Sequence, residues 1–130
     1  MTHPKLSKLK TSRVEKGWGY ELILVNNEEY CGKILHFNAG SKFSMHSHLQ
    51  KRETFYCSFG ELEVEGINTE DATRYFFALK AGEVLDIPRG AFHQITAKQE
   101  SEVVEVSTTH WDEDSFRVCP GNSQIKNIHG

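Results

Sequence analysis

The chain has 130 residues, which is enough for one hydrophobic core but short for two independent ones. Hydrophobic residues make up 38% of the chain and aromatic residues 11%, and this mixture excludes an intrinsically disordered protein. The formal net charge of -3 argues against a dedicated nucleic-acid-binding protein, because such proteins need a basic face that displaces counterions from phosphates.

The sequence also limits the compartment in which we expect this protein. No apolar run approaches the roughly 20 residues that cross a bilayer, so we expect no membrane association. The polar start of the chain, residues 1–5, predicts that there is no secretory signal. The cysteines are sparse, odd in number and without C-x-x-C spacing, which predicts free thiols in a reducing cytoplasm: Cys31, Cys57 and Cys119.

Short segments rich in β-branched and aromatic residues follow one another along the chain, separated by glycine and asparagine. Several alternate between apolar and polar residues, as residues 61–65 do, and this alternation is typical of half-buried antiparallel strands. After Trp111, the acidic residues 112–114 suit the start of a short helical turn. Many short strands with turns between them predict an all-β antiparallel sandwich or barrel. The predicted strands are residues 20–25, 33–37, 43–48, 54–59, 61–65, 75–79, 84–87, 92–96 and 102–107.

Three histidines and one glutamate are candidate metal ligands. His46 and His48 are two residues apart in a predicted strand, so both imidazoles point to the same face. Glu53 begins the next strand, and His93 follows a bend at residues 88–90. Imidazole and carboxylate ligands together suit a divalent transition metal. The alternative is that His46 and His48 form an ordinary polar pair, since an isolated His-x-His match is weak evidence for a metal.

The spacing around these residues makes the metal interpretation stronger. Glycines flank the first group at Gly40 and Gly60, and the ordered series Gly82, Pro88, Gly90 precedes His93. Each of these positions would match a fixed pattern by chance about 5–7% of the time, so joint agreement is improbable by accident. The glycines also fall at predicted strand ends, where tight turns need positive φ angles.

Residues 40–60 and 82–97 resemble, in order and internal spacing, the two conserved motifs of the cupin superfamily. The one departure is Ala97, where the second motif often carries an asparagine that is not a metal ligand. The resemblance implies a single-domain cupin β-barrel, a jelly roll also called a double-stranded β-helix. It implies one divalent transition metal ion (Mn, Fe, Co, Ni or Zn) held by His46, His48, Glu53 and His93. The domain would span residues 14–118, with a loose or dimer-associated extension at 1–13 and a polar tail at 119–130.

Other residues are candidates for substrate binding and proton transfer. Ser44 shares the face of the two histidines, whereas Lys33 and Arg52 are candidate anion anchors that solvated surface charge explains equally simply. Glu105 lies in an apolar predicted strand, so it either points outward or lies inside with a raised pKa, as a general base would. The remaining histidines with no ligand spacing are expected on the surface: His36, His110 and His129.

The segment at residues 15–21 is similar to the start of cupins related to type II mannose-6-phosphate isomerase, with Gly17 where those proteins have proline. That resemblance implies a homodimer acting on a sugar or sugar phosphate. The reaction would be aldose–ketose isomerisation through a metal-polarised enediol, with Glu105 as a candidate base. Two alternatives stay open: a metal-dependent dioxygenase, and a non-catalytic cupin that binds a sugar or an anion.

Overall fold

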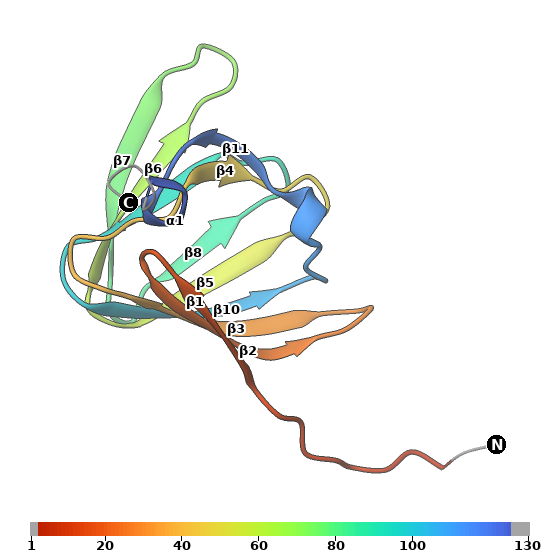
Figure 1. Cartoon of the computed structure of the whole chain (residues 1–130). Helices are drawn as coiled ribbons and strands as arrows, with labels where there is room; N and C mark the ends of the chain where they lie inside the picture. Colours follow the sequence, from red (N-terminus) through yellow and green to blue (C-terminus); the bar gives the residue numbers. More distant parts are fainter. Residues whose placement is uncertain (1–2, 126–130) are drawn as a thin grey trace.

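A computed structural model describes residues 3–125 of the chain and shows two antiparallel β-sheets that face each other (Figure 1). The larger sheet has the strand order β1-β2-β3-β10-β5-β8. Its strands are β1 (Ser12–Lys16), β2 (Gly19–Asn26), β3 (Cys31–Phe37), β10 (Ser101–Ser107), β5 (Glu53–Phe59) and β8 (Val84–Ile87). The all-β prediction is therefore confirmed, and this sheet supplies one wall of the interior.

The smaller sheet has the order β11-β4-β9-β6-β7 and forms the opposite wall. Its strands are β11 (Phe116–Cys119), β4 (Met45–Ser47), β9 (His93–Ala97), β6 (Glu61–Ile67) and β7 (Arg74–Lys80). A 3₁₀ turn, η1 (Asp112–Asp114), and a short helix, α1 (Asn122–Ile125), precede and follow β11. Chain neighbours such as β3 and β4 lie in different sheets, which is how a jelly roll encloses its interior.

The core fills the space between the sheets and reaches the histidines at Phe43, whose ring centroid lies 5.0 Å from that of His46. Along β3, β5, β6 and β10, buried residues alternate with more exposed ones, because successive side chains of a strand point to opposite faces. Trp18 stacks on Phe37 with 4.7 Å between ring centroids, and Phe55 and Ile95 are almost completely buried. Each large side chain buried here contributes about 1.5–3 kcal/mol, so the apolar end supports the polar one.

Every predicted strand is present, most of them one or two residues longer than predicted. Strands β1 and β11 were not predicted. Both are mostly exposed: β1 contains a single apolar residue, and the alternation in β11 covers only four residues, which is too short to predict a strand. The turn at Asp112–Asp114 is present as predicted. All four glycines of the two motifs have positive φ, and at Gly90 this conformation lets the backbone N–H donate to the carbonyl of His48 at 2.7 Å.

The two ends of the described chain behave differently. Residues 3–11 are exposed throughout and run away from the sheets (Figure 1). Near the other end, Asn122 exchanges backbone and side-chain hydrogen bonds with Lys42, and Ser123 accepts one from Gly17. Residues 126–130, which include His129, lie outside the described residues.

Two further observations bear on the predicted compartment. The thiols of Cys31, Cys57 and Cys119 are free, as predicted. Within residues 3–125, no helix has the length and apolar character needed to span a membrane.

Candidate metal centre

Strand pairing brings the three candidate histidines together. His46 lies in β4, His48 follows that strand directly, and His93 is the first residue of β9, where it pairs with His46. One ring nitrogen from each of the three histidines lies within 4.8 Å of the others. The two separate sequence motifs thus meet at one point of the smaller sheet.

Backbone carbonyls fix the orientation of each imidazole. Nδ1 of His46 lies 2.7 Å from the carbonyl oxygen of Ser44. Nδ1 of His48 lies 2.8 Å from that of Asp114, and Nδ1 of His93 lies 2.9 Å from that of Ala91. A carbonyl only accepts hydrogen bonds, so Nδ1 must carry the proton and donate it. Nε2 of each neutral ring then keeps a free lone pair, as metal-ligating histidines do.

Glu53, the first residue of β5, completes the group from the opposite sheet. Its Oε2 lies 3.4 Å from Nε2 of His93, and its Oε1 lies 3.9 Å from Nε2 of His48. Glu53 Oε2 and His93 Nε2 are both buried, and neither has a hydrogen-bond partner within the described chain. Buried polar atoms are normally paired, so these two indicate that something else satisfies them.

The charge state of the group suits a divalent cation. Burial, helped by the neighbouring imidazoles, lowers the pKa of His46 to about 3. Burial likewise lowers the pKa of His48 to about 4, although Glu53 opposes the shift. Burial disfavours the charged form of Glu53, but His93 and the Lys51 ammonium together outweigh it and hold the pKa of this carboxyl far below its usual value. The neutral imidazoles of His46 and His48 beside the ionised carboxylate of Glu53 are donors that a divalent transition metal requires, so the residues fit the ion.

A buried lysine stands beside the metal ligands. Lys51 Nζ lies 2.8 Å from Glu53 Oε1, 3.2 Å from Glu105 Oε2 and 3.0 Å from His110 Nδ1. Burial alone would lower the pKa of Lys51, but the two carboxylates raise it above its usual value, so the ammonium stays charged. Of the two orientations left open for Glu105, the structure shows the inward one. Burial and the charge of Glu53 raise the pKa of the Glu105 carboxyl.

The expectation that His110 lies on the surface is wrong. Its side chain is mostly buried and lines the cavity, where Nε2 lies 3.0 Å from the carboxylate of Asp112. Burial and the lysines Lys33 and Lys51 lower the pKa of His110. His36, in contrast, stacks on Tyr20 on the outer side of the larger sheet and takes no part in the site.

Asp114 shapes the loop that carries the ligands. Its carboxylate accepts hydrogen bonds from the backbone N–H groups of Leu49, Gln50 and Lys51 at 2.9–3.1 Å, and its own carbonyl accepts the proton of His48. Burial opposes these backbone bonds but does not outweigh them, so the pKa of Asp114 is lowered. One side chain therefore holds the turn between the histidine pair and Glu53.

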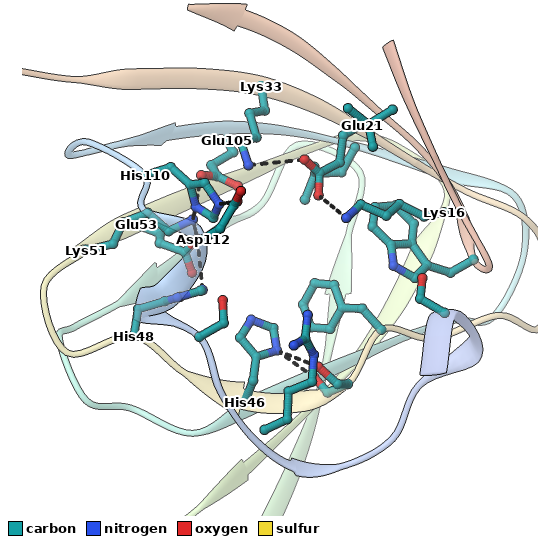
Figure 2. A pocket seen from close by; sticks show the side chains of 18 of the residues that line it. Lys16, Glu21, Lys33, His46, His48, Lys51, Glu53, Glu105, His110 and Asp112 are labelled. Carbon is teal, nitrogen blue, oxygen red and sulfur yellow. Dashed lines mark hydrogen bonds and ion pairs between the residues drawn. The ribbon is translucent and has the colours of Figure 1, made fainter. Parts of the chain in front are cut away.

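Most of these groups line a cavity of about 490 Å³ that opens between the sheets (Figure 2): His46, His48, Lys51, Glu53, Glu105 and His110. Cavities of this size hold small organic molecules. Lys33 and Ser44, two of the candidate substrate-binding residues, are in its lining. The structure does not bring Arg52 to the cavity: since Glu53 points inward, its strand neighbour points outward, and Arg52 pairs with Asp86 on the surface at 3.3 Å.

Sequence reasoning missed several residues that face this cavity. Lys51 had a usable signal, because it lies two residues before Glu53 and therefore shares its inward face. Asp114 and His110 had none, since they reach the site through a loop far away in the chain. Two cations at the rim of the cavity, Lys16 and Arg117, were also missed, and both lie in the strands that were not predicted.

Comparison with known proteins identifies the family. The chain is 33% identical over 129 residues to a D-lyxose ketol-isomerase from Thermofilum sp. (strain ex4484_79), covering 82% of this chain and 72% of that protein. It is 30% identical over 115 residues to a D-lyxose/D-mannose isomerase from Thermosediminibacter oceani, covering 72% of this chain and 64% of that protein.

Solved structures agree on the fold. A tryptophan-to-phenylalanine variant of oxalate decarboxylase from Bacillus subtilis superposes with a TM-score of 0.74 at 20% identity, over 89% of this chain and 34% of that one. The capsular polysaccharide assembling protein CapF from Staphylococcus aureus superposes with a TM-score of 0.75 at 16% identity, over 86% of this chain and 32% of that one. The chain thus spans only about a third of the length of these two structures. The cupin family model matches residues 12–118, and the chain therefore belongs to the cupin family.

Proposed function

We propose that this protein is a metal-dependent aldose–ketose isomerase acting on a sugar or sugar phosphate. The observation that carries the proposal is that three imidazoles, each with Nδ1 held by a backbone carbonyl, converge beside Glu53 at a cavity that the inward carboxyl of Glu105 also lines. The names of the two relatives, both sugar isomerases, support the same chemistry.

His46, His48, His93 and Glu53 would hold the ion. A divalent metal bound there supplies Lewis-acid polarisation of the substrate's neighbouring carbonyl and hydroxyl oxygens. Open positions would remain for substrate, because four protein ligands do not fill a six-coordinate ion. The sequence and the donor set accept Mn, Fe, Co, Ni or Zn alike.

Glu105 is the group that we propose moves the proton. Lys51 and Ser107 both donate to Oε2 of Glu105, at 3.2 and 3.0 Å, which leaves Oε1 as the oxygen free to meet a substrate. Isomerisation removes a proton from C2 of the aldose and returns one to C1, so no oxidant or co-substrate is consumed. A carboxyl with a raised pKa is suited to both steps, because its carboxylate is the stronger base when it takes up the proton and its acid form then returns it.

Turnover by the metal-loaded protein tests the proposal. D-lyxose, D-mannose and D-mannose 6-phosphate would each be supplied with Mn²⁺, Co²⁺, Ni²⁺ or Zn²⁺, and ketose formation followed by NMR. We expect conversion of at least one sugar without oxygen uptake, and a loss of about 100-fold or more in Glu105→Gln. Glu102→Gln is the matched control, because Glu102 lies on the outer face of the same strand and contacts His36. Oxygen-dependent product formation would instead select the dioxygenase, and sugar binding with no turnover would select the non-catalytic alternative.

We also propose that the protein is a cytoplasmic homodimer. Strand β7 lies at the edge of the smaller sheet and exposes Tyr75, Phe76 and Phe77, and exposed apolar edges favour pairing. Light scattering of the full chain measures its mass directly, and a monomer at micromolar concentration would contradict the dimer.

A further inference from the structure

Two cations stand at the rim of the cavity, away from Lys51 and the carboxylates. Lys16 ends β1 and is half-buried, and Arg117 lies in β11 directly opposite His46 in the strand register. Both line the cavity. Figure 2 shows Lys16 across the opening from His110 and Asp112. A molecule bound in the cavity would therefore lie between Lys16 and the side that carries His110 and Asp112, with Arg117 next to His46 in the neighbouring strand.

The other two cations of the cavity are already neutralised by the protein. Lys51 lies between Glu53 and Glu105, and Lys33 Nζ lies 3.1 Å from Glu21 Oε1. Both lysines are almost completely buried. Neither has charge left for a ligand, because each ammonium is held against at least one carboxylate inside the protein.

The rim cations differ in this respect. Within residues 3–125, no carboxylate lies within ion-pair distance of the Arg117 guanidinium, and no side chain there accepts a hydrogen bond from it. Lys16 Nζ lies 3.6 Å from Glu21, but that carboxylate is held more closely by Lys33. Arg117 is largely exposed, so nothing in the described chain requires a cation there for stability.

We propose that Arg117, assisted by Lys16, binds the anionic end of the substrate, and that this anion is a phosphate monoester. The proposal rests on the proposed isomerase activity, since it places the substrate's carbonyl end at His46 and Glu53. A guanidinium offers two parallel N–H donors to phosphate oxygens. A phosphate monoester carries a charge of about -1.5 to -2 near neutral pH. Two cations therefore balance the charge of a phosphate monoester better than the single charge of a carboxylate.

The subsite would set this chain's substrate preference. The two relatives carry the names of neutral sugars. The rim cations of this chain predict a preference for a sugar phosphate over the neutral sugar of the same configuration. Arg117 is thus a specificity-determining residue, and it takes no part in proton transfer.

Binding of molecules that cannot react tests the subsite separately from catalysis. D-mannitol, D-mannitol 1-phosphate and D-mannonate have no aldehyde or ketone and cannot be isomerised, so calorimetric titration of the full chain with each reports affinity alone. We expect the phosphate to bind about tenfold or more tightly than mannitol, and the carboxylate of mannonate to gain less. Equal affinities for mannitol and its phosphate would overturn the proposal, and a stronger preference for mannonate would assign the subsite to carboxylates instead of phosphates.

Variants at the rim complete the test. Arg117→Gln should abolish the preference for phosphate, Lys16→Gln should reduce it, and Arg117→Lys should restore part of it. Arg52→Gln is the matched control, because Arg52 lies outside the cavity, and it should leave every affinity unchanged. An equal loss in Arg52→Gln would show nonspecific attraction to the surface and contradict the subsite. Phosphate-selective binding in a protein that isomerises no sugar would refute the proposed function and leave the subsite standing.

Discussion

Two cations that face the same cavity, Lys51 and Arg117, are in opposite situations. Lys51 is buried and touches two carboxylates and a histidine, whereas Arg117 lies at the rim without an acidic partner in the described chain. Charge alone would make both of them candidate anion sites. The difference shows that the partners of a cation, and not its sign, decide whether it organises the protein or remains available to a ligand.

The same contrast divides the whole cavity. The wall around Lys51 contains ligands whose protons and orientations are fixed by hydrogen bonds, from Asp114 in particular. The rim at Lys16 and Arg117 contains few such bonds. We therefore expect changes in the wall to affect metal binding and stability, and changes at the rim to affect only ligand preference.

Removal of a proposed metal ligand should have the largest effect. His93→Ala takes away one of three converging imidazoles and should reduce the metal bound after loading and dialysis from one ion per chain to background. Elemental analysis measures the content. His36→Ala is the control, because His36 lies on the outer face of the larger sheet. Retention of metal with unchanged affinity in His93→Ala would contradict the metal site.

Removal of the buried Lys51 ammonium should have the second-largest effect. Lys51→Met leaves Glu53 and Glu105 without their shared cation and should lower the free energy of unfolding of the metal-free protein by about 3 kcal/mol. Arg52→Met, one residue further along, should change it by less than about 0.5 kcal/mol, because the pair with Asp86 is exposed. Urea denaturation compares the two variants. An equal loss of unfolding free energy in both would show that the buried ion pairs of Lys51 stabilise the fold no more than the exposed pair of Arg52.

The pH dependence of stability should sharpen the contrast further. In the metal-free protein the folded-state pKa values of His46 and His48 are about 3 and about 4, below the 6.5 of a solvated imidazole. Between these values the unfolded chain binds more protons than the folded one. This contribution to stability is therefore complete above pH 6.5 and is lost as the pH falls toward 4, by up to about 1.4 kcal/mol per pH unit for each histidine.

Denaturation of the metal-free protein at several pH values between 7 and 5 measures that slope. His46→Gln, which cannot titrate, should reduce it, whereas a slope unchanged by this substitution would show that the imidazoles are not desolvated in the folded state.

The smallest effect should come from the rim. Lys16→Met should change the free energy of unfolding by less than about 0.5 kcal/mol, because Glu21 keeps its closer partner Lys33. Thermal or urea denaturation checks this value. A loss as large as that of Lys51→Met would place Lys16 in the structural wall and weaken its assignment to ligand binding.

Much of the fold followed from local patterns. Alternating apolar residues and glycines at strand ends predicted every strand that has a buried face, since those patterns depend only on the neighbouring residues of the chain. Strands β1 and β11 escaped prediction because they are largely exposed and are held by pairing with other strands. The contacts between Asn122 and Lys42 join residues 80 positions apart, so no local pattern could indicate them.

The sequence by itself determined the candidate ligands His46, His48, Glu53 and His93, because their spacing and their period along strands are properties of the chain. Only the tertiary structure decided their surroundings. It placed Lys51 between two carboxylates, brought Asp114 and His110 to the ligand loop, and turned Glu105 inward. It also sent Arg52 outward and left Arg117 at the rim without a carboxylate partner among residues 3–125. Burial and charge pairing depend on which strands face each other, and that arrangement is fixed only when the two sheets close around their shared interior.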